Sequence, residues 1–129
     1  MIARLISLIG LLCITNACIG AEYDCPVNKK LTANLDYSKE KLDQFQFRVE
    51  IKDDPEGAII SRCSYAPSKQ AVTCDRYNVD RVETDPYVKI KKFYVFRSQF
   101  DVQIFTDLTF IENNGRGDIA FGTCRLIAP

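Results

Sequence analysis

The stretch AIISRCSYAPSKQAVTCDRYNV, residues 58–79, contains two β-prone runs separated by a turn. Pro67 favours a turn here, because proline interrupts the hydrogen bonding of a central strand. If the turn is centred on the Ser-Lys pair that follows Pro67, Cys63 and Cys74 stand directly opposite each other. Opposed positions of an antiparallel pair bring Cβ atoms close enough for a disulfide. The spacing therefore predicts a β-hairpin carrying a Cys63–Cys74 bridge.

The N-terminal residues show the three-part pattern of a secretory signal peptide. A basic residue, Arg4, precedes an apolar run over residues 5–14, and small residues precede a cleavage point before Ala21. An uncleaved anchor is the alternative, but the run is shorter than the roughly 20 residues that span a bilayer. We expect residues 1–20 to be a signal peptide and residues 21–129 to form one secreted, extracellular domain without a transmembrane segment.

The cysteine count supports an oxidising compartment. Cys13 and Cys18 would leave with the signal peptide, and an even number in a small secreted domain indicates two disulfides. With Cys63 and Cys74 assigned to the hairpin, the second predicted bridge joins Cys25 to Cys124. A zinc site is the alternative, but the chain has no C-x-x-C pair and no histidine. We therefore predict no metal and no cofactor.

Most of the remaining chain has strand character. In FQFRVEI, residues 45–51, Phe45, Phe47, Val49 and Ile51 alternate with polar residues, which is typical of a half-buried strand. YSKEKLDQF, residues 37–45, could form a short helix with Ser38 as N-cap, and a charged loop is the alternative.

A long strand is predicted in YVKIKKFYVF, residues 87–96. Each of its faces is basic near the start and apolar near the end, so we expect it to run from an exposed rim into the core. Its lysines could bind an anionic head group. The interpretation that the sequence favours is that they protect a solvated sheet edge from pairing with another chain.

The spacing of turn signals gives about seven or eight short strands in all. The predicted fold class is all-β, an antiparallel two-sheet sandwich of the immunoglobulin-like kind, and a barrel is the second choice.

The residue inventory limits the chemistry. Without histidine, and with the mature cysteines in disulfides, triads and Cys-His pairs are excluded. The carboxylates lie in turn-like segments, so we assign no catalytic residue and expect no enzyme. Seventeen basic and seventeen acidic residues balance over the whole chain, which gives no reason to propose a nucleic-acid partner. We expect a monomeric binding protein.

Aromatic residues are abundant for a domain of this size, with eight phenylalanines and six tyrosines in the chain. Core packing explains most of them. Alternatively, the two sheets could enclose an apolar cavity that binds a lipid or other amphiphile. The candidate ligand-binding residues are then Phe93, Phe96, Lys89, Lys91 and Lys92.

The four cysteines Cys25, Cys63, Cys74 and Cys124, together with the all-β pattern, resemble the ML-type lipid-recognition domains. Members of that family hold lipids or sterols between two sheets, so the resemblance implies a ligand class. It identifies no individual binding residue in this chain. The chain is also similar in style to small secreted β-sandwich proteins of invertebrates.

The segment FIENNGRGDIAFGTC, residues 110–124, contains the tripeptide Arg116-Gly117-Asp118, which integrin receptors read on other proteins. Asparagine and glycine are also what a hairpin turn selects, so the local chemistry explains most of the segment without a receptor. Exposed loops are nevertheless where recognition is commonly placed. The tripeptide is therefore the alternative candidate site, for an adhesion or signalling factor recognised by a cell-surface receptor.

Overall fold

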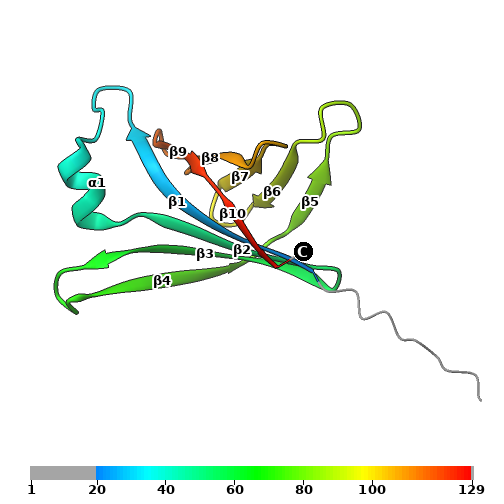
Figure 1. Ribbon diagram of the computed structural model, residues 1–129, viewed down its shortest axis with the longest axis horizontal. Coiled ribbons are helices and arrows are strands. Elements are labelled where there is room, and N and C mark those ends of the chain that lie inside the picture. Colours follow the sequence, from blue (N-terminus) through cyan, green and yellow to red (C-terminus); the bar gives the residue numbers. More distant parts are fainter. Residues whose placement is uncertain (1–19, 129) are drawn as a thin grey trace, which may run out of the picture.

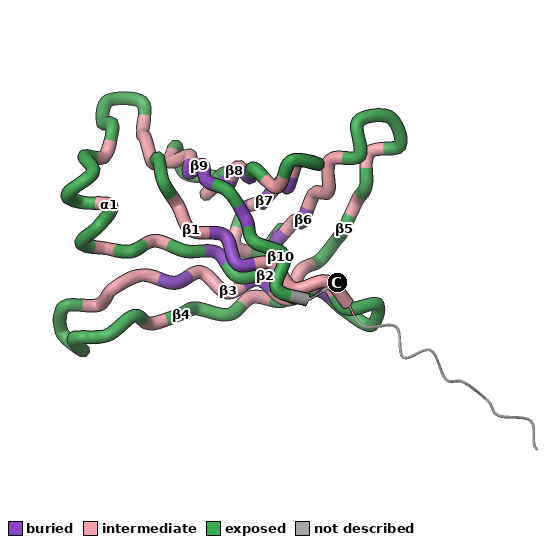
Figure 2. Tube along the Cα trace, in the orientation of Figure 1, coloured by how far each residue is buried: buried purple, intermediate pink, exposed green. Residues whose placement is uncertain are grey.

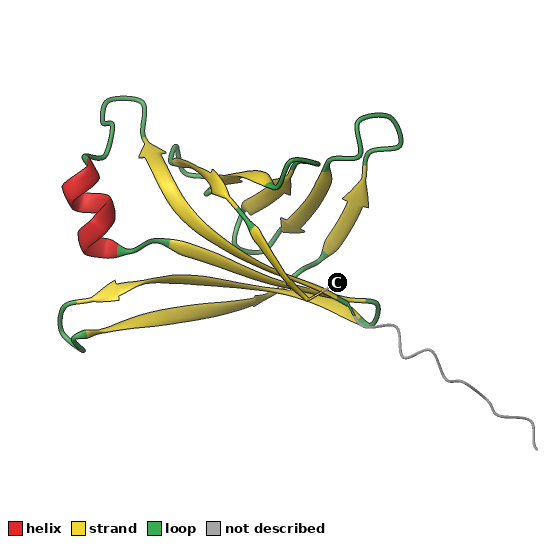
Figure 3. Ribbon diagram, viewed as in Figure 1, coloured by secondary structure: helices red, strands yellow, loops and turns green. Residues whose placement is uncertain are grey.

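The computed structural model describes residues 20–128, except for the side chain of residue 128. The predicted signal peptide, residues 1–20, lies outside this range apart from Gly20, so it stays a prediction. Within the range the chain forms ten strands and one helix (Figures 1 and 3). Their bounds are β1 Ala21–Leu31, α1 Lys39–Phe45, β2 Arg48–Asp54, β3 Gly57–Ala66, β4 Ala71–Asn78, β5 Arg81–Thr84, β6 Lys91–Val95, β7 Phe100–Ile104, β8 Thr109–Asn113, β9 Ile119–Thr123 and β10 Arg125–Ala128.

All strands belong to one antiparallel sheet that curls into a half-barrel, in the order β4-β3-β2-β1-β9-β8-β7-β6-β5, with β10 paired to β1. The all-β, antiparallel prediction is confirmed. The predicted two-sheet sandwich is not confirmed, since the strands form one continuous curled sheet, and the ten strands exceed the seven or eight predicted. The strand count was too low partly because β5 is short and polar and β10 is short and terminal, so neither shows a clear alternation of apolar and polar residues.

Strand β1 is the reason why the sheet is continuous. Its residues Ala21–Pro26 pair with β2, and its residues from Val27 to Leu31 pair with β9. The change of partner falls at Pro26, which has no N–H to donate to a ladder. One long strand therefore joins a first half, β2 to β4, to a second half, β5 to β9.

The two halves face each other across a packed core. Figure 2 shows the buried positions gathered where the ribbons converge. The first half contributes Val49, Ile51 and Ile60, and the second half contributes Phe93, Val102 and Phe110, all at most 1% exposed. Phe100 of β7 packs edge-on against Tyr77 of β4, with 4.9 Å between ring centroids. The inner faces of the curled sheet are thus held together mainly by apolar side chains.

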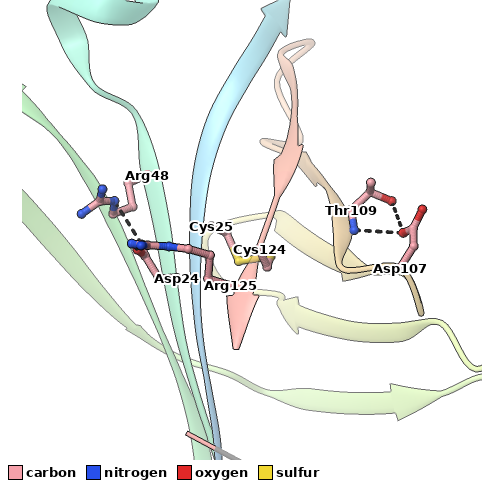
Figure 4. The surroundings of a disulfide bond; sticks show 7 residues. All are labelled: Asp24, Cys25, Arg48, Asp107, Thr109, Cys124 and Arg125. Carbon is pink, nitrogen blue, oxygen red and sulfur yellow. Dashed lines mark hydrogen bonds and ion pairs between the residues drawn. A yellow bond between two sulfur atoms is a disulfide. The ribbon is translucent and has the colours of Figure 1, made fainter. Parts of the chain in front are cut away.

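Both predicted disulfides are present. Cys63 pairs with Cys74 at directly opposed positions of β3 and β4. Cys25 of β1 pairs with Cys124, which lies between β9 and β10 (Figure 4). Beside this second bridge the buried carboxylate of Asp24 forms ion pairs with Arg48 and Arg125. The start of the described chain is therefore fastened to its end covalently and electrostatically.

The helical alternative for residues 37–45 is confirmed, since α1 begins after Ser38, whose Oγ accepts a hydrogen bond from the Lys41 N–H at 3.2 Å. Consequently the strand predicted from Phe45 begins only at Arg48: Phe45 ends the helix, and Gln46 follows in the left-handed conformation. Within residues 20–128, no helix is long and apolar enough to cross a membrane.

The strand predicted over residues 87–96 is shorter than expected, because β6 begins at Lys91. The carboxylate of Asp85 accepts hydrogen bonds from the backbone N–H groups of Val88 (2.9 Å) and Tyr87 (2.8 Å). These bonds hold residues 85–88, which precede β6, in a turn that exposes Tyr87 and Val88. The predicted alternation does hold within β6, where Phe93 and Val95 are buried.

Candidate functional site

The loop between β8 and β9 is ordered by its two asparagines. The Asn113 Oδ1 accepts a hydrogen bond from the Gly115 N–H at 2.9 Å. The Asn114 Oδ1 accepts two more, from the N–H groups of Arg116 (2.8 Å) and Asp118 (3.0 Å). The Asn114 N–H also donates to the Asp118 carbonyl at 3.1 Å. The loop is therefore a supported hairpin turn, as the sequence predicted.

Two glycines in this loop adopt backbone angles that favour glycine. Gly115 has φ 73°, and a Cβ built on it would lie 1.7 Å from the backbone oxygen of Gln99. Gly117 has φ 96°, but a Cβ there would meet no atom within 4 Å. Gly115 thus packs the loop against the neighbouring β6–β7 turn, whereas Gly117 lies in open space.

The tripeptide is presented at the tip of this hairpin. Arg116 and Gly117 are exposed, and Asp118 is half-buried at the start of β9. Among residues 20–128, neither Arg116 nor Asp118 has an ion-pair partner. The tripeptide therefore combines an exposed guanidinium with a half-buried carboxylate.

The predicted ligand-binding residues do not line one cavity. Phe93 is fully buried in the core, whereas Phe96 is 58% exposed in the β6–β7 turn. Lys91 forms an ion pair with Asp53, and Lys92 lies on the outward side of β6, beside Glu83. Lys89 is exposed in the β5–β6 loop. Their role in ligand binding stays a prediction.

A cleft that the sequence did not reveal lies between the two halves of the sheet, beside the hairpin loop. Its volume is about 170 Å³. Polar and apolar side chains from both halves line it, and we call it the Lys30 cleft; its principal residues are Val27, Lys30, Phe47, Val49, Arg62, Tyr77, Glu112 and Ala120.

The strand register explains how charges come to face this cleft. Lys30 of β1 pairs with Ala120 of β9, and Ala120 pairs with Glu112 of β8, so the three form one row. From the opposite half, Arg62 donates to the Glu112 Oε1 through Nη2 at 2.7 Å and Nε at 3.1 Å. The Arg62 guanidinium also lies 4.7 Å from the Phe100 ring centroid. This ion pair connects the halves across the interior.

Lys30 is half-buried among aromatic rings. Its Nζ lies 4.1 Å from the centroid of Phe47 and 5.5 Å from that of Tyr37. Burial lowers the pKa of Lys30 from its ordinary value of 10.5, an effect that Glu112 and Asp118 oppose and Arg62 reinforces. The lowered pKa means that the nearby carboxylates offset only part of the cost of burying the Lys30 ammonium.

A sequence signal for two of these residues did exist. Arg62 follows Ala58 and Ile60 on the inward face of its strand, and Glu112 follows Phe110 in the same way. A charged residue at an inward position requires a partner, so the two could have been paired. Lys30 could not have been found, because an irregularity in β1 between Val27 and Lys29 hides which lysine points inward.

Comparison with known protein families, with curated proteins and with solved structures finds no match. Among residues 20–128, no group of three or more cysteine, aspartate or glutamate side chains is arranged to hold a metal ion.

Proposed function

We propose that this chain is a secreted, non-enzymatic recognition protein that a cell-surface receptor engages through Arg116-Gly117-Asp118. The observation that carries the proposal is the loop itself. Its backbone is held by the asparagine side chains, while Arg116 and Asp118 lack ion-pair partners among residues 20–128. A preorganised loop loses little conformational freedom on binding, which favours recognition.

Secretion and the lack of enzymatic activity are parts of the same proposal. Two disulfides suit an oxidising compartment and agree with the predicted signal peptide. The chain has no histidine, and its cysteines at 25, 63, 74 and 124 are all oxidised, which removes the usual general base and the thiol nucleophile.

The test is cell attachment to the immobilised protein in the presence of divalent cations. Asp118→Glu keeps the charge but adds one methylene, which misplaces the carboxylate relative to a receptor-bound metal ion. We expect this variant to lose attachment. Asp36→Glu is the matched control, since Asp36 is exposed and its side chain makes no hydrogen bond or ion pair in the described part of the chain. Failure of the parent protein to support attachment, or full attachment by Asp118→Glu, would reject the proposal.

Carriage of a lipid-like ligand between the halves of the sheet is our second candidate. It is favoured by the aromatic-rich inner face, in line with the resemblance to ML-type domains. Because Phe93 and Phe110 are packed in the core, a long-chain lipid requires the halves to separate. Native mass spectrometry with lipid extraction, on protein from its own source, tests it. Recovery of empty protein only, with no uptake from a mixed lipid panel, would exclude this function.

A further inference from the structure

The Lys30 ammonium reaches the cleft without an ion pair in the described part of the chain. Within residues 20–128, no carboxylate lies within ion-pair distance of its Nζ, and no side-chain hydrogen bond from Lys30 is formed. The rings of Phe47 and Tyr37 contact the ammonium through cation–π interactions, which leave its N–H groups without a hydrogen-bond acceptor from these two residues. An external anion would give this half-buried ammonium a charge-assisted hydrogen bond that the described residues do not supply.

The other charges around Lys30 do not change this balance. Arg62 and Glu112 neutralise each other in a direct ion pair. Asp118 acts on Lys30 only at longer range, without a direct contact. Asp75, at the far wall of the cleft, is exposed to solvent and lies opposite Arg62 in the sheet. Arg48, which also lines the cleft, is paired with Asp24. Among the described residues, Lys30 and Asp75 are therefore the lining charges without an ion pair, and of these two only Lys30 is half-buried.

The apolar walls and the volume of the cleft limit which anion could bind there. Val27, Val49 and Ala120 supply apolar surface beside the ammonium. A volume near 170 Å³ corresponds to on the order of six water molecules and falls below the roughly 300 Å³ of sites for drug-sized ligands. We propose that the Lys30 cleft binds a small monocarboxylate, with its carboxylate on Lys30 and a short apolar tail against the β1, β2 and β9 walls.

This site is separate from the receptor proposal. A small carboxylate enters the cleft without contact with Arg116 or Gly117, and it requires no opening of the core. Asp118 acts on Lys30 at longer range, and Asp118→Glu keeps that charge. We therefore expect Asp118→Glu to bind butyrate as the parent does and Lys30→Gln to support cell attachment as the parent does, which distinguishes failure of one proposal from failure of the other.

The experiment is an NMR titration of the full secreted chain with sodium butyrate, followed by the amide shifts of residues around the cleft and the ¹³Cε signal of Lys30. We expect saturable shifts at Val27 and Ala120, a Kd on the order of millimolar for so small a ligand, and a rise in the Lys30 pKa. Butyramide, the neutral analogue, should produce no saturable shift.

Two variants make the test specific. Lys30→Gln should weaken butyrate binding about ten-fold or more, because it removes the charged donor. Lys29→Gln is the matched control, since Lys29 is adjacent in β1 but exposed, and it should bind as the parent does. Unfolding curves for both variants establish that they are folded. Absence of saturable shifts in the parent, equal binding of butyramide, or unchanged binding by Lys30→Gln would overturn the proposal.

Discussion

The disulfide between Cys25 and Cys124 should stabilise the protein more than the hairpin disulfide does. The first bridge joins cysteines 99 positions apart, and the bridge between Cys63 and Cys74 joins cysteines 11 positions apart. The two double variants Cys25→Ala/Cys124→Ala and Cys63→Ala/Cys74→Ala each remove one bridge and keep the other. They are therefore matched perturbations of one fold.

The expected magnitudes follow from loop length. In the chain-entropy description a closed loop of about 100 residues contributes roughly 4.7 kcal/mol, and a loop of about 12 residues contributes roughly 2.8 kcal/mol. The difference of about 2 kcal/mol grows further, because truncation of Cys25 and Cys124 removes two buried side chains. In the hairpin bridge only Cys63 is buried, and Cys74 is exposed.

Urea unfolding at 25 °C, followed by far-UV circular dichroism, measures the effect. A loss of this size is a large part of the ~5–15 kcal/mol by which domains are stable, so all curves should be recorded in the same concentration of trimethylamine oxide. We expect the unfolding free energy to fall in the order parent, hairpin variant, variant without the 25–124 bridge. An equal loss in the two variants, or a greater one in the hairpin variant, would refute the reasoning.

Three further predictions concern the loop, the interior and the β5–β6 turn. Gly115→Ala should unfold at a much lower urea concentration than Gly117→Ala, because the new Cβ at residue 115 would lie 1.7 Å from a backbone oxygen. Gly117→Ala meets no such atom and should lose only about 1–2 kcal/mol of stability, for its positive φ. Equal urea midpoints for the two variants would contradict this prediction. Glu112→Gln should cost about 2–3 kcal/mol in urea unfolding because it leaves Arg62 without its counter-charge, and a double-mutant cycle with Arg62→Met should show positive coupling. Backbone hydrogen bonds lower the pKa of Asp85 from 3.8, so its contribution to stability should be complete above pH 3.8 and should fade as the pH falls through its folded-state pKa; a ¹³C titration midpoint at or above 3.8 would disprove it.

Local chemistry made the hairpin predictable from sequence. The turn at Pro67 and the symmetric cysteines set the register of β3 against β4, and Cys63 is indeed opposite Cys74. Once this pair was fixed, the other bridge followed by elimination. The loop at 113–118 was predictable for the same reason, since asparagine and glycine specify a turn over a few residues.

The sequence pattern could not predict which strands pair over long distances in the chain. Nothing in residues 21–31 shows that one strand pairs with β2 before Pro26 and with β9 after it, yet this change of partner makes the sheet continuous. The cleft depends on the same feature, because the register after the irregularity near Val27 turns Lys30 inward. A cation at an inward position of a curled sheet is a product of topology and could not be inferred from alternation.

The two halves of the curled sheet are joined in different ways along its width. At β1, which lies inside the strand order, the halves share a strand, and the disulfide from Cys25 fastens that strand to Cys124. The edge strands β4 and β5 are not paired with each other in the described sheet. The chain itself links these edge strands through residues 79 and 80. Across the interior the halves are joined by the ion pairs Arg62–Glu112 and Lys91–Asp53 and by core packing. Those ion pairs break at far lower cost than a disulfide-fastened strand, so entry of a larger amphiphile between the halves would have to break them before it disturbed β1. We therefore expect that variants which remove either ion pair would change uptake of a larger amphiphile, whereas the loop at residues 113–118, on the β8–β9 hairpin next to β1, would keep its conformation.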